Sequence, residues 1–353
     1  MKSALRELPG CGTPEAPAPA KRHRPLSREE YRDGILLGDR SVLARAVTMI
    51  ESAREADREV AEQIVEDCLP HCGDSVRVGI TGVPGAGKST LIEALGGFLI
   101  ETKKQKVAVL AIDPSSQISG GSILGDKTRM PRLAASEMAF IRPSPSRGTA
   151  GGVAQRTREA MLLCEAAGYP NILVETIGVG QSETAVHEMV DFFLLITLAG
   201  AGDELQGIKR GVMELADLVA VNKADGENVA TAERARAESQ NALHFFPASG
   251  SGWTPRAVTC SALTGAGIPE LWERVQEHAA LTRSNGWFAA SRREQQRRWM
   301  HEMIDQALRT RFFTHPEVRD RMEALERDVT EGRTTSFRAA RTLLAAYSDP
   351  GRV

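Results

Sequence analysis

The sequence predicts an α/β fold of the doubly wound type, a mostly parallel sheet with helices on both faces. Three observations carry this prediction. Strand-like and helical segments alternate from about residue 75 to 280, several strands are continuous apolar runs, and the first strand leads into a glycine-rich loop. Continuous apolar runs indicate parallel strands that are buried on both faces. Ligands of such sheets bind at the carboxyl ends of the strands, so we expect the functional residues there.

The predicted elements follow one another in the order that this fold requires. Strands are expected at Val76–Thr81, Val107–Ile112, Phe140–Arg142, Ile172–Glu175, Phe192–Thr197, Leu218–Asn222 and Ala257–Ser261. Helices are expected at Lys88–Leu99, Val153–Ala167, Gly207–Ala216, Val229–Leu243 and Pro269–Ala279.

The loop after the first strand matches the pattern G-x-x-x-x-G-K-[ST] at Gly82, Gly87, Lys88 and Ser89. Glycines let the backbone curl, so that several N–H groups point into one small cavity. The lysine of this pattern reaches the β- and γ-phosphates, and the hydroxyl ligates Mg²⁺. We therefore predict a nucleoside triphosphate site that consists of Gly82, Val83, Pro84, Gly85, Ala86, Gly87, Lys88, Ser89 and Thr90.

Two later motifs predict that the base is guanine. Asn222-Lys223-Ala224-Asp225 follows a strand and matches N-K-x-D. Its Asp carboxylate can accept hydrogen bonds from N1–H and the exocyclic amine of guanine, and adenine has no such donor pair. Ser261-Ala262-Leu263 matches S-A-[KL], whose backbone contacts the guanine oxygen. The predicted ligand is GTP or GDP.

Carboxylates follow two further strands. Asp113 comes after the second strand, where it could order Mg²⁺ or its waters; the alternative is an Asp-Pro turn that ends the strand. Glu175-Thr-Ile-Gly178 takes the place of the D-x-x-G segment of GTPases. Glu175 can hold a metal-bound water, and Gly178 offers an N–H to the γ-phosphate. Gln181 follows closely, but its position does not support a water-positioning role.

Composition limits the remaining possibilities. The net charge is -2, so no global basic field favours nucleic acid, and no apolar run is long enough to span a membrane. The five cysteines are scattered, which favours a reducing, cytoplasmic location. Cys68, His71 and Cys72 could begin a metal site, although this spacing alone is a weak signal.

The two ends of the chain differ from the centre. We expect a disordered, proline-rich tail at 1–26, with a transit peptide as the alternative, then a helical extension at 27–73 and the nucleotide-binding domain at 74–281. A helical segment follows at 282–353, with the apolar rows Trp299/Met303/Ala307 and Met300/Ile304/Leu308. These rows either pack on the chain's own core or form a dimer arm.

Taken together, the motifs resemble the MeaB/ArgK-type (MMAA-like) family of G-protein chaperones of adenosylcobalamin-dependent acyl-CoA mutases. The resemblance covers about Leu36 to Trp299. It rests on segments that begin Asp113-Pro-Ser-Ser116, Gly120-Gly-Ser-Ile-Leu-Gly-Asp126, Arg142-Pro-Ser-Pro-Ser-Arg-Gly148, Glu175-Thr-Ile-Gly178, Gly200-Ala-Gly-Asp-Glu-Leu-Gln206 and Asn222-Lys-Ala-Asp225. Thr197-Leu-Ala199-Gly200 departs from the pattern, because many relatives have Pro before the Gly.

The resemblance implies a homodimeric P-loop GTPase of the metallochaperone-like (SIMIBI) class. It implies roles linked to Mg²⁺ or phosphate for Ser89, Asp113, Asp126 and Glu175. It also implies three switch segments, matched here by Asp113–Met130, Glu175–His187 and Gly200–Lys209. Gln206 and Lys209 would be residues of the third switch that approach the nucleotide when a mutase is bound. GTP hydrolysis would gate the transfer of adenosylcobalamin from its adenosyltransferase into the mutase and allow removal of damaged cobalamin, without tight binding of cobalamin to this chain.

Two alternatives remain open from the sequence. A GTPase that delivers nickel would belong to the same broad class, but it usually needs a Cys/His platform. A P-loop kinase, the older label of ArgK relatives, is disfavoured by Asn222–Asp225, because a kinase has little need of a guanine reader and three switch loops.

Overall fold

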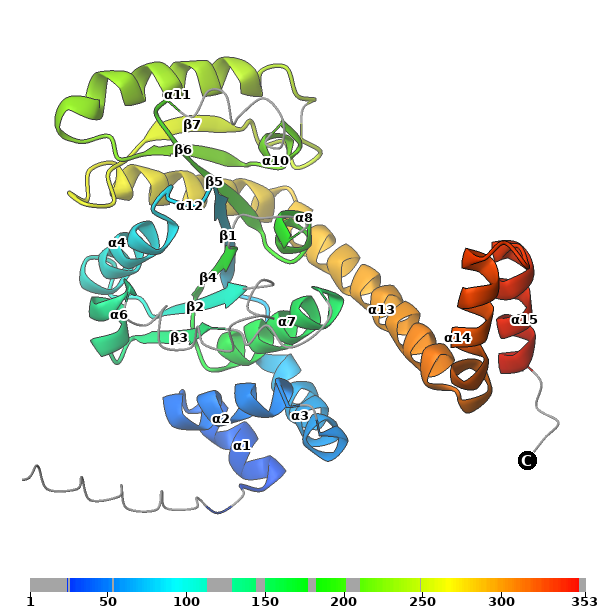
Figure 1. Ribbon diagram of the computed structural model, residues 1–353. Helices are drawn as coiled ribbons and strands as arrows, with labels where there is room; N and C mark the ends of the chain where they lie inside the picture. The colour runs from blue at the N-terminus through cyan, green and yellow to red at the C-terminus, as the bar shows by residue number, and fades with distance from the viewer. Residues whose placement is uncertain are drawn as a thin grey trace, which may run out of the picture.

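The computed structural model describes residues 24, 26–52, 54–112, 129–143, 150–176, 182–200, 210–247 and 249–348. Its centre is a seven-stranded sheet in which neighbouring strands are parallel, in the order β3-β2-β4-β1-β5-β6-β7 (Figure 1). The strands are β1 (Val76–Gly82), β2 (Val107–Ile112), β3 (Ala139–Pro143), β4 (Asn171–Thr176), β5 (Phe192–Leu198), β6 (Leu218–Asn222) and β7 (Arg256–Thr259). The doubly wound α/β prediction is confirmed, and every predicted strand begins and ends within two residues of an observed one.

Helices cover both faces of the sheet, because alternate strand residues point to opposite sides. On β5, Leu194 and Ile196 join the core beneath α4 and α12, whereas Phe193 and Leu195 face the other layer. The first layer consists of α4 (Lys88–Glu101), α6 (Pro131–Ala135) and α12 (Ile268–Ser284). The second consists of α7 (Ala150–Ala166), α8 (Ser182–His187), α10 (Arg210–Glu214) and α11 (Val229–Leu243), the last preceded by the short η2 (Gly226–Asn228).

Three helices precede the sheet and pack on α7: α1 (Arg28–Leu36), α2 (Arg40–Ile50) and α3 (Glu55–Cys68), followed by η1 (Leu69–His71). Ser27 and Glu30 form a capping box at the start of α1, as the sequence predicts. Ile35, Leu43 and Ile64 are fully buried in one core with Met161 of α7. These helices therefore share a hydrophobic core with the sheet.

The C-terminal helices leave the sheet as an arm. The 28-residue α13 (Trp287–Thr314) projects outward and carries a hairpin of α14 (Pro316–Thr330) and α15 (Ser336–Ser348) at its end (Figure 1). The alternative that the apolar rows pack on the chain's own core is wrong for most of their length. Met300, Met303, Ile304 and Leu308 are exposed, because α13 has already left the sheet layers there. Trp299, at the start of the rows, packs partly against the core.

Smaller differences concern helix ends. The helix expected at Gly207–Ala216 is observed as Arg210–Glu214, and 207–209 lie outside the described residues. The helix expected at Pro269–Ala279 continues to Ser284. The division into a tail, two extensions and a central domain stays a prediction. In the described part of the chain, no helix combines the length and apolarity that crossing a membrane requires.

Candidate functional site

The phosphate-binding loop connects the end of β1 to the start of α4, at the carboxyl edge of the sheet. Gly82, Gly85 and Gly87 have φ angles of 153°, 80° and 88°, which favour glycine. Space also requires it: a Cβ on Gly82 would lie 2.3 Å from the Ile196 carbonyl oxygen, and one on Gly87 would lie 2.7 Å from Asn222 Nδ2. The loop therefore depends on glycine at the positions that the sequence motif specifies.

Lys88 lies inside this loop and closes it. Its Nζ donates to the carbonyl oxygens of Gly82 (2.7 Å) and Val83 (3.2 Å). Burial lowers the pKa of Lys88, while the carboxylates of Glu175 and Glu183 act in the opposite direction. Lys88 is thus a buried cation at the N-terminus of α4, where the helix dipole also favours an anion.

Ser89 and Glu175 meet beside Lys88. The Ser89 hydroxyl, in the first turn of α4, donates to Glu175 Oε1 near the end of β4 at 2.9 Å. Two hard oxygen donors next to a phosphate loop fit Mg²⁺, which prefers such ligands and usually shares them with phosphate. Asp113 and Asp126 lie outside the described residues, as do Gly178, Gln206 and Lys209. Their predicted roles therefore stay predictions.

The base side of the site is built from the loops after β6 and β7. Asn222 donates from Nδ2 to the Ala86 carbonyl (2.8 Å) and accepts from the Ala262 N–H at Oδ1 (3.0 Å). The Ser261 hydroxyl donates to Asp225 Oδ2, which orients the carboxylate expected to bind guanine. The two base motifs therefore come together as the sequence predicts, through Asn222 with Ala262 and through Asp225 with Ser261.

Two predicted base-side residues present their side chains outward. Lys223 has a φ of 61°, an uncommon conformation for a non-glycine residue, and it is exposed. The Leu263 side chain is 82% exposed.

One residue of the expected second switch segment, Glu175–His187, had no predicted role of its own. Glu183 stands in the first turn of α8, is buried, and acts on the charge of Lys88. A signal was present in the sequence, because Glu183 precedes Val186 by three residues and a helix places both on one face. Because Glu183 and Lys88 are far apart in the sequence, the sequence alone did not show that their charges interact.

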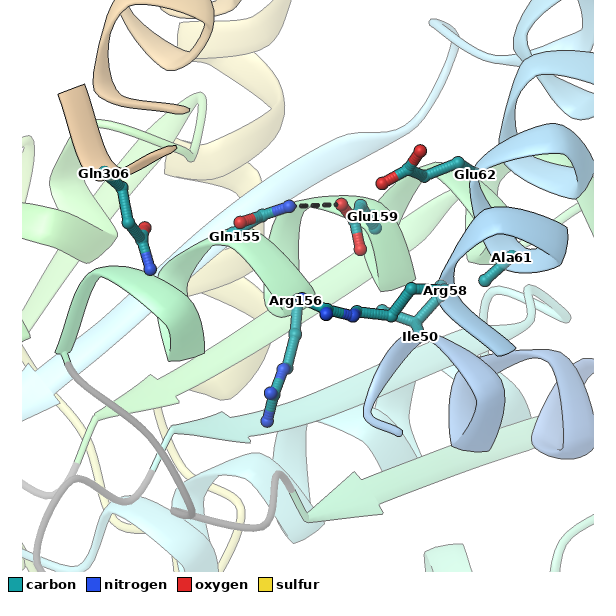
Figure 2. A pocket seen from close by; sticks show the side chains of 8 residues that line it. All are labelled: Ile50, Arg58, Ala61, Glu62, Gln155, Arg156, Glu159 and Gln306. Atoms are coloured by element: carbon teal, nitrogen blue, oxygen red, sulfur yellow. Dashed lines mark hydrogen bonds between the residues drawn. The ribbon is translucent and has the colours of Figure 1, made fainter. Parts of the chain in front are cut away.

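A separate pocket of about 90 Å³ lies between α3, α7 and α13 (Figure 2). Glu159 accepts a hydrogen bond from Gln155 Nε2 at 3.0 Å. Burial raises the pKa of Glu159, and the nearby charge of Arg156 opposes this effect. None of the predicted site residues lines this pocket.

The cysteines offer no support for a nickel platform. Cys72 Sγ contacts the carbonyl oxygens of Cys68 (3.3 Å) and Leu162 (3.2 Å). Burial raises the pKa of Cys68 to about 11 and that of Cys72 to about 12, which favours thiols over the thiolates that bind metals. Among the residues that the structure describes, no group of three or more His, Cys, Asp or Glu residues is placed to hold a metal ion.

Comparison with known proteins supports the assignment of a GTP-binding site. Residues 43–317 match the family described as "Methylmalonyl Co-A mutase-associated GTPase MeaB". The chain belongs to the MeaB family. A "Putative GTPase" of Caulobacter vibrioides is 50% identical over 322 residues, which cover 91% of this chain and 98% of that relative. The MeaB-family chain is therefore a P-loop GTPase that hydrolyses GTP, as the phosphate and base motifs predict.

Two other relatives extend the comparison. The mouse protein named "Methylmalonic aciduria type A homolog, mitochondrial" is 44% identical, over 89% of this chain and 78% of that protein. A solved structure titled "Crystal structure of LAO/AO transport system kinase" has a TM-score of 0.72 and 37% identity, and it covers 90% of this chain and 96% of its own. The MeaB-family fold thus extends over most of the chain.

Proposed function

We propose that this GTPase is a chaperone of an adenosylcobalamin-dependent acyl-CoA mutase, methylmalonyl-CoA mutase or a relative. GTP binding and hydrolysis would gate delivery of adenosylcobalamin to the mutase and would protect or reactivate it. The match to the MeaB family over residues 43–317 carries this proposal, because that family is named for its association with the mutase. The mouse relative's name points to the same metabolism.

The described residues support a nucleotide-dependent switch. The Ser89–Glu175 hydrogen bond joins the fixed phosphate loop to the end of β4, immediately before the segment that begins at residue 177. In GTPases the γ-phosphate and Mg²⁺ hold such segments, which are released on hydrolysis. Mg²⁺ would be held here by Ser89 and Glu175, with Asp113 and Asp126, and would neutralise phosphate charge.

Stimulation by the mutase would act through the third switch. A cation that a partner positions at the transferred phosphate can raise the rate ~10³–10⁵-fold. Lys209 would supply that cation from this chain, with Gln206 beside it, once the partner orders the segment. In that case Lys209→Ala should abolish partner-stimulated hydrolysis and leave the basal rate nearly unchanged. Unchanged stimulation in Lys209→Ala would remove the role.

The proposed partners are the mutase, the adenosyltransferase that supplies the cofactor, and a second copy of this chain, in the cytoplasm. A pull-down with candidate mutases in GDP or a non-hydrolysable GTP analogue, followed by hydrolysis assays, tests the proposal. One mutase should bind in a nucleotide-dependent manner and stimulate hydrolysis. If no cobalamin-dependent mutase does so, the chaperone role is wrong although the GTPase activity stands. Phosphate transferred to protein or arginine instead of water would favour the kinase alternative.

A further inference from the structure

The end of β4 lies beside the phosphate loop, and its last two side chains make hydrogen bonds on opposite faces of the sheet. Leu173 belongs to the core beneath α4, whereas Val174 belongs to the core beneath α7. Because side chains alternate along a strand, Glu175 projects toward α4 and Thr176 toward the α7 face. On the α4 face, Glu175 accepts the hydrogen bond from Ser89.

On the other face, Thr176 bonds to β1. Its hydroxyl donates to the Thr81 hydroxyl at 2.9 Å, and both side chains are fully buried. Thr81 directly precedes Gly82, the first glycine of the phosphate loop. The hydrogen bond therefore joins the residue before the phosphate loop to the residue after Glu175.

This hydroxyl pair extends the junction of β1 and β4 beyond their backbone pairing. The register of the two strands ends with Ile80 opposite Glu175. On its other side, β4 stays paired with β2 as far as Thr176, which lies opposite Ile112. Hydrogen bonds between threonines on neighbouring strands stabilise a sheet. The bond from Thr176 to Thr81 is thus a further link from β4 to β1, one residue closer to the phosphate loop.

The contact between Ser89 and Glu175 depends on this junction. Ser89 is carried by α4, which follows β1 and the phosphate loop, whereas Glu175 is carried by β4. The two side-chain oxygens stay 2.9 Å apart only if the ends of β1 and β4 keep a fixed spacing. The hydrogen bond between Thr81 and Thr176 resists a change of that spacing, because neither buried hydroxyl can turn to water instead.

We propose that Thr176, with Thr81 as its partner, is a positioning residue that holds the Glu175 carboxylate in place for Mg²⁺. The inference rests on the proposed Mg²⁺ site of Ser89 and Glu175, and it is independent of the mutase proposal. Removing a group that orients a metal ligand typically lowers metal affinity by about 10–100-fold. Thr176 acts through the end of the strand, so the lower limit of this range applies.

The test measures how much Mg²⁺ the nucleotide complex requires. Thr176→Val keeps the shape and removes the hydroxyl, so the Mg²⁺ concentration for half-maximal binding of a non-hydrolysable GTP analogue should rise about tenfold. GDP affinity in EDTA should stay unchanged, because the glycines and Lys88 of the phosphate loop are intact. Thr176→Ser keeps the hydroxyl and should restore the natural Mg²⁺ requirement. An unchanged requirement in Thr176→Val, or an equal loss of GDP affinity in EDTA, would overturn the proposal.

Thr282→Val is the matched control, because it removes a buried threonine hydroxyl far from Glu175. Thr282 donates to the His278 carbonyl at 2.8 Å, and His278 packs against Phe192 at the start of β5. The control should leave the Mg²⁺ requirement unchanged. If Thr176→Val does not fold, Thr81→Val takes its place, since it removes the same hydrogen bond from the β1 side. Its Mg²⁺ requirement should rise to a similar extent, and an unchanged requirement would again contradict the proposal.

Glu175→Gln separates the inference from the metal site on which it rests. This variant should raise the Mg²⁺ requirement by itself. If it does not, the proposed Mg²⁺ site is wrong and the inference falls with it; if it does and Thr176→Val does not, the inference alone is wrong. In a Glu175→Gln background, Thr176→Val should add nothing, because the carboxylate that it positions is gone. A further rise there would show that Thr176 does not act through Glu175.

Discussion

Asn222 connects the phosphate loop to the base loop, a role that its motif does not describe. It is almost fully buried, and its amide bridges the Ala86 carbonyl and the Ala262 N–H. Gly87 can have no side chain because one would collide with Nδ2 of Asn222. One amide thus holds two loops that are distant in sequence, and it fixes their spacing.

Asn222→Ala should destabilise the nucleotide-free protein by about 2–4 kcal/mol, because a buried carbonyl and a partly buried N–H lose their partners. Urea unfolding without nucleotide measures this change. Asn228→Ala is the control, since Asn228 is an exposed residue of η2 in the following turn. Equal midpoints for the two variants would mean that Asn222 contributes to base recognition alone.

Asp217 is a partly buried carboxylate at the amino ends of β5 and β6, opposite the nucleotide loops. It should make the stability of the protein depend on pH. It accepts from the Phe193 N–H (2.8 Å) and lies 3.8 Å from His278 Nε2. Burial raises the pKa of Asp217 to about 7. The folded state therefore holds this proton more tightly than the unfolded state, and the contribution of Asp217 to stability falls as pH rises from about 4 to about 7.

Asp217→Asn isolates this contribution, because it removes the titrating group but leaves His278, whose pKa burial lowers to about 4. The variant should gain stability relative to the natural protein as pH rises through this window. The gain should be on the order of 2 kcal/mol, reduced by the one-fifth exposure of the side chain. Unfolding curves between pH 4 and 8 measure it, with exposed Asp74→Asn as the control. A constant difference across pH would contradict the assignment.

Single residues were predictable where chemistry is written in contiguous motifs. Gly82 to Ser89 and Asn222 to Asp225 are such stretches, because one loop must provide several contacts to one ligand. The second role of Asn222 was not predictable, since it depends on which distant loop packs beside this side chain. A residue inside a motif can therefore acquire a further role from tertiary contacts.

At the scale of elements, Arg292 fastens the arm helix α13 to the sheet. Its guanidinium donates to both carboxylate oxygens of Asp191 (2.8 and 2.7 Å), to Glu165 (3.1 Å), and to the carbonyls of Gly73 and Ser75. Burial opposes ionisation of Glu165, yet Arg77 and Arg292 together lower its pKa. One side chain therefore joins α13, α7, and the starts of β1 and β5.

Arg292→Ala should cost about 3–5 kcal/mol, because two buried carboxylates lose a cation that they share. Arg293→Ala is the control, since Arg293 is exposed on the next position of the same helix. Urea unfolding measures the loss, and hydrogen exchange at 287–299 should rise if α13 detaches. A loss below about 1 kcal/mol, with unchanged exchange, would show that Gln295 and Trp299 suffice to hold the helix.

Elements were predictable in proportion to their burial. Strands such as β2 and β6 agree with their predicted bounds, because a strand buried on both faces must be apolar along its length. The short helix α10 and the path of α13 were less predictable. Their sequences contain apolar positions that a helical pattern alone cannot assign to the chain's own core or to another surface.

At the scale of the whole molecule, the arm presents an apolar surface that the described part of the chain does not cover. Gln295 is the one buried residue of α13 in that part, whereas Met300 and Leu308 are 52% and 53% exposed. Exposed apolar stripes of this kind mark interaction sites. A second copy is the occupant we propose, because two-fold symmetry lets identical helices cover each other.

Ile304→Asp should shift the protein from dimer to monomer, because it places a charge in the centre of the stripe where water would be excluded. A loss of about 3 kcal/mol raises the dimer dissociation constant by about 100-fold. Sedimentation velocity across a micromolar dilution series measures it. Asp305→Ala is the control, since it changes the adjacent exposed position, which does not belong to the stripe.

Dimerisation through the arm would also connect the dimer surface to the nucleotide site. The base of α13 contacts the segment after α8 through Gln295, which donates to the Val190 carbonyl (2.9 Å). The opposite end of α8 carries Glu183, which acts on Lys88. If dimerisation restrains α13, the dimer should bind GDP with a different affinity from the monomer, and linkage requires GDP to change dimerisation by the same factor. Equal GDP affinity in Ile304→Asp and the natural protein would mean that the arm does not influence the nucleotide site.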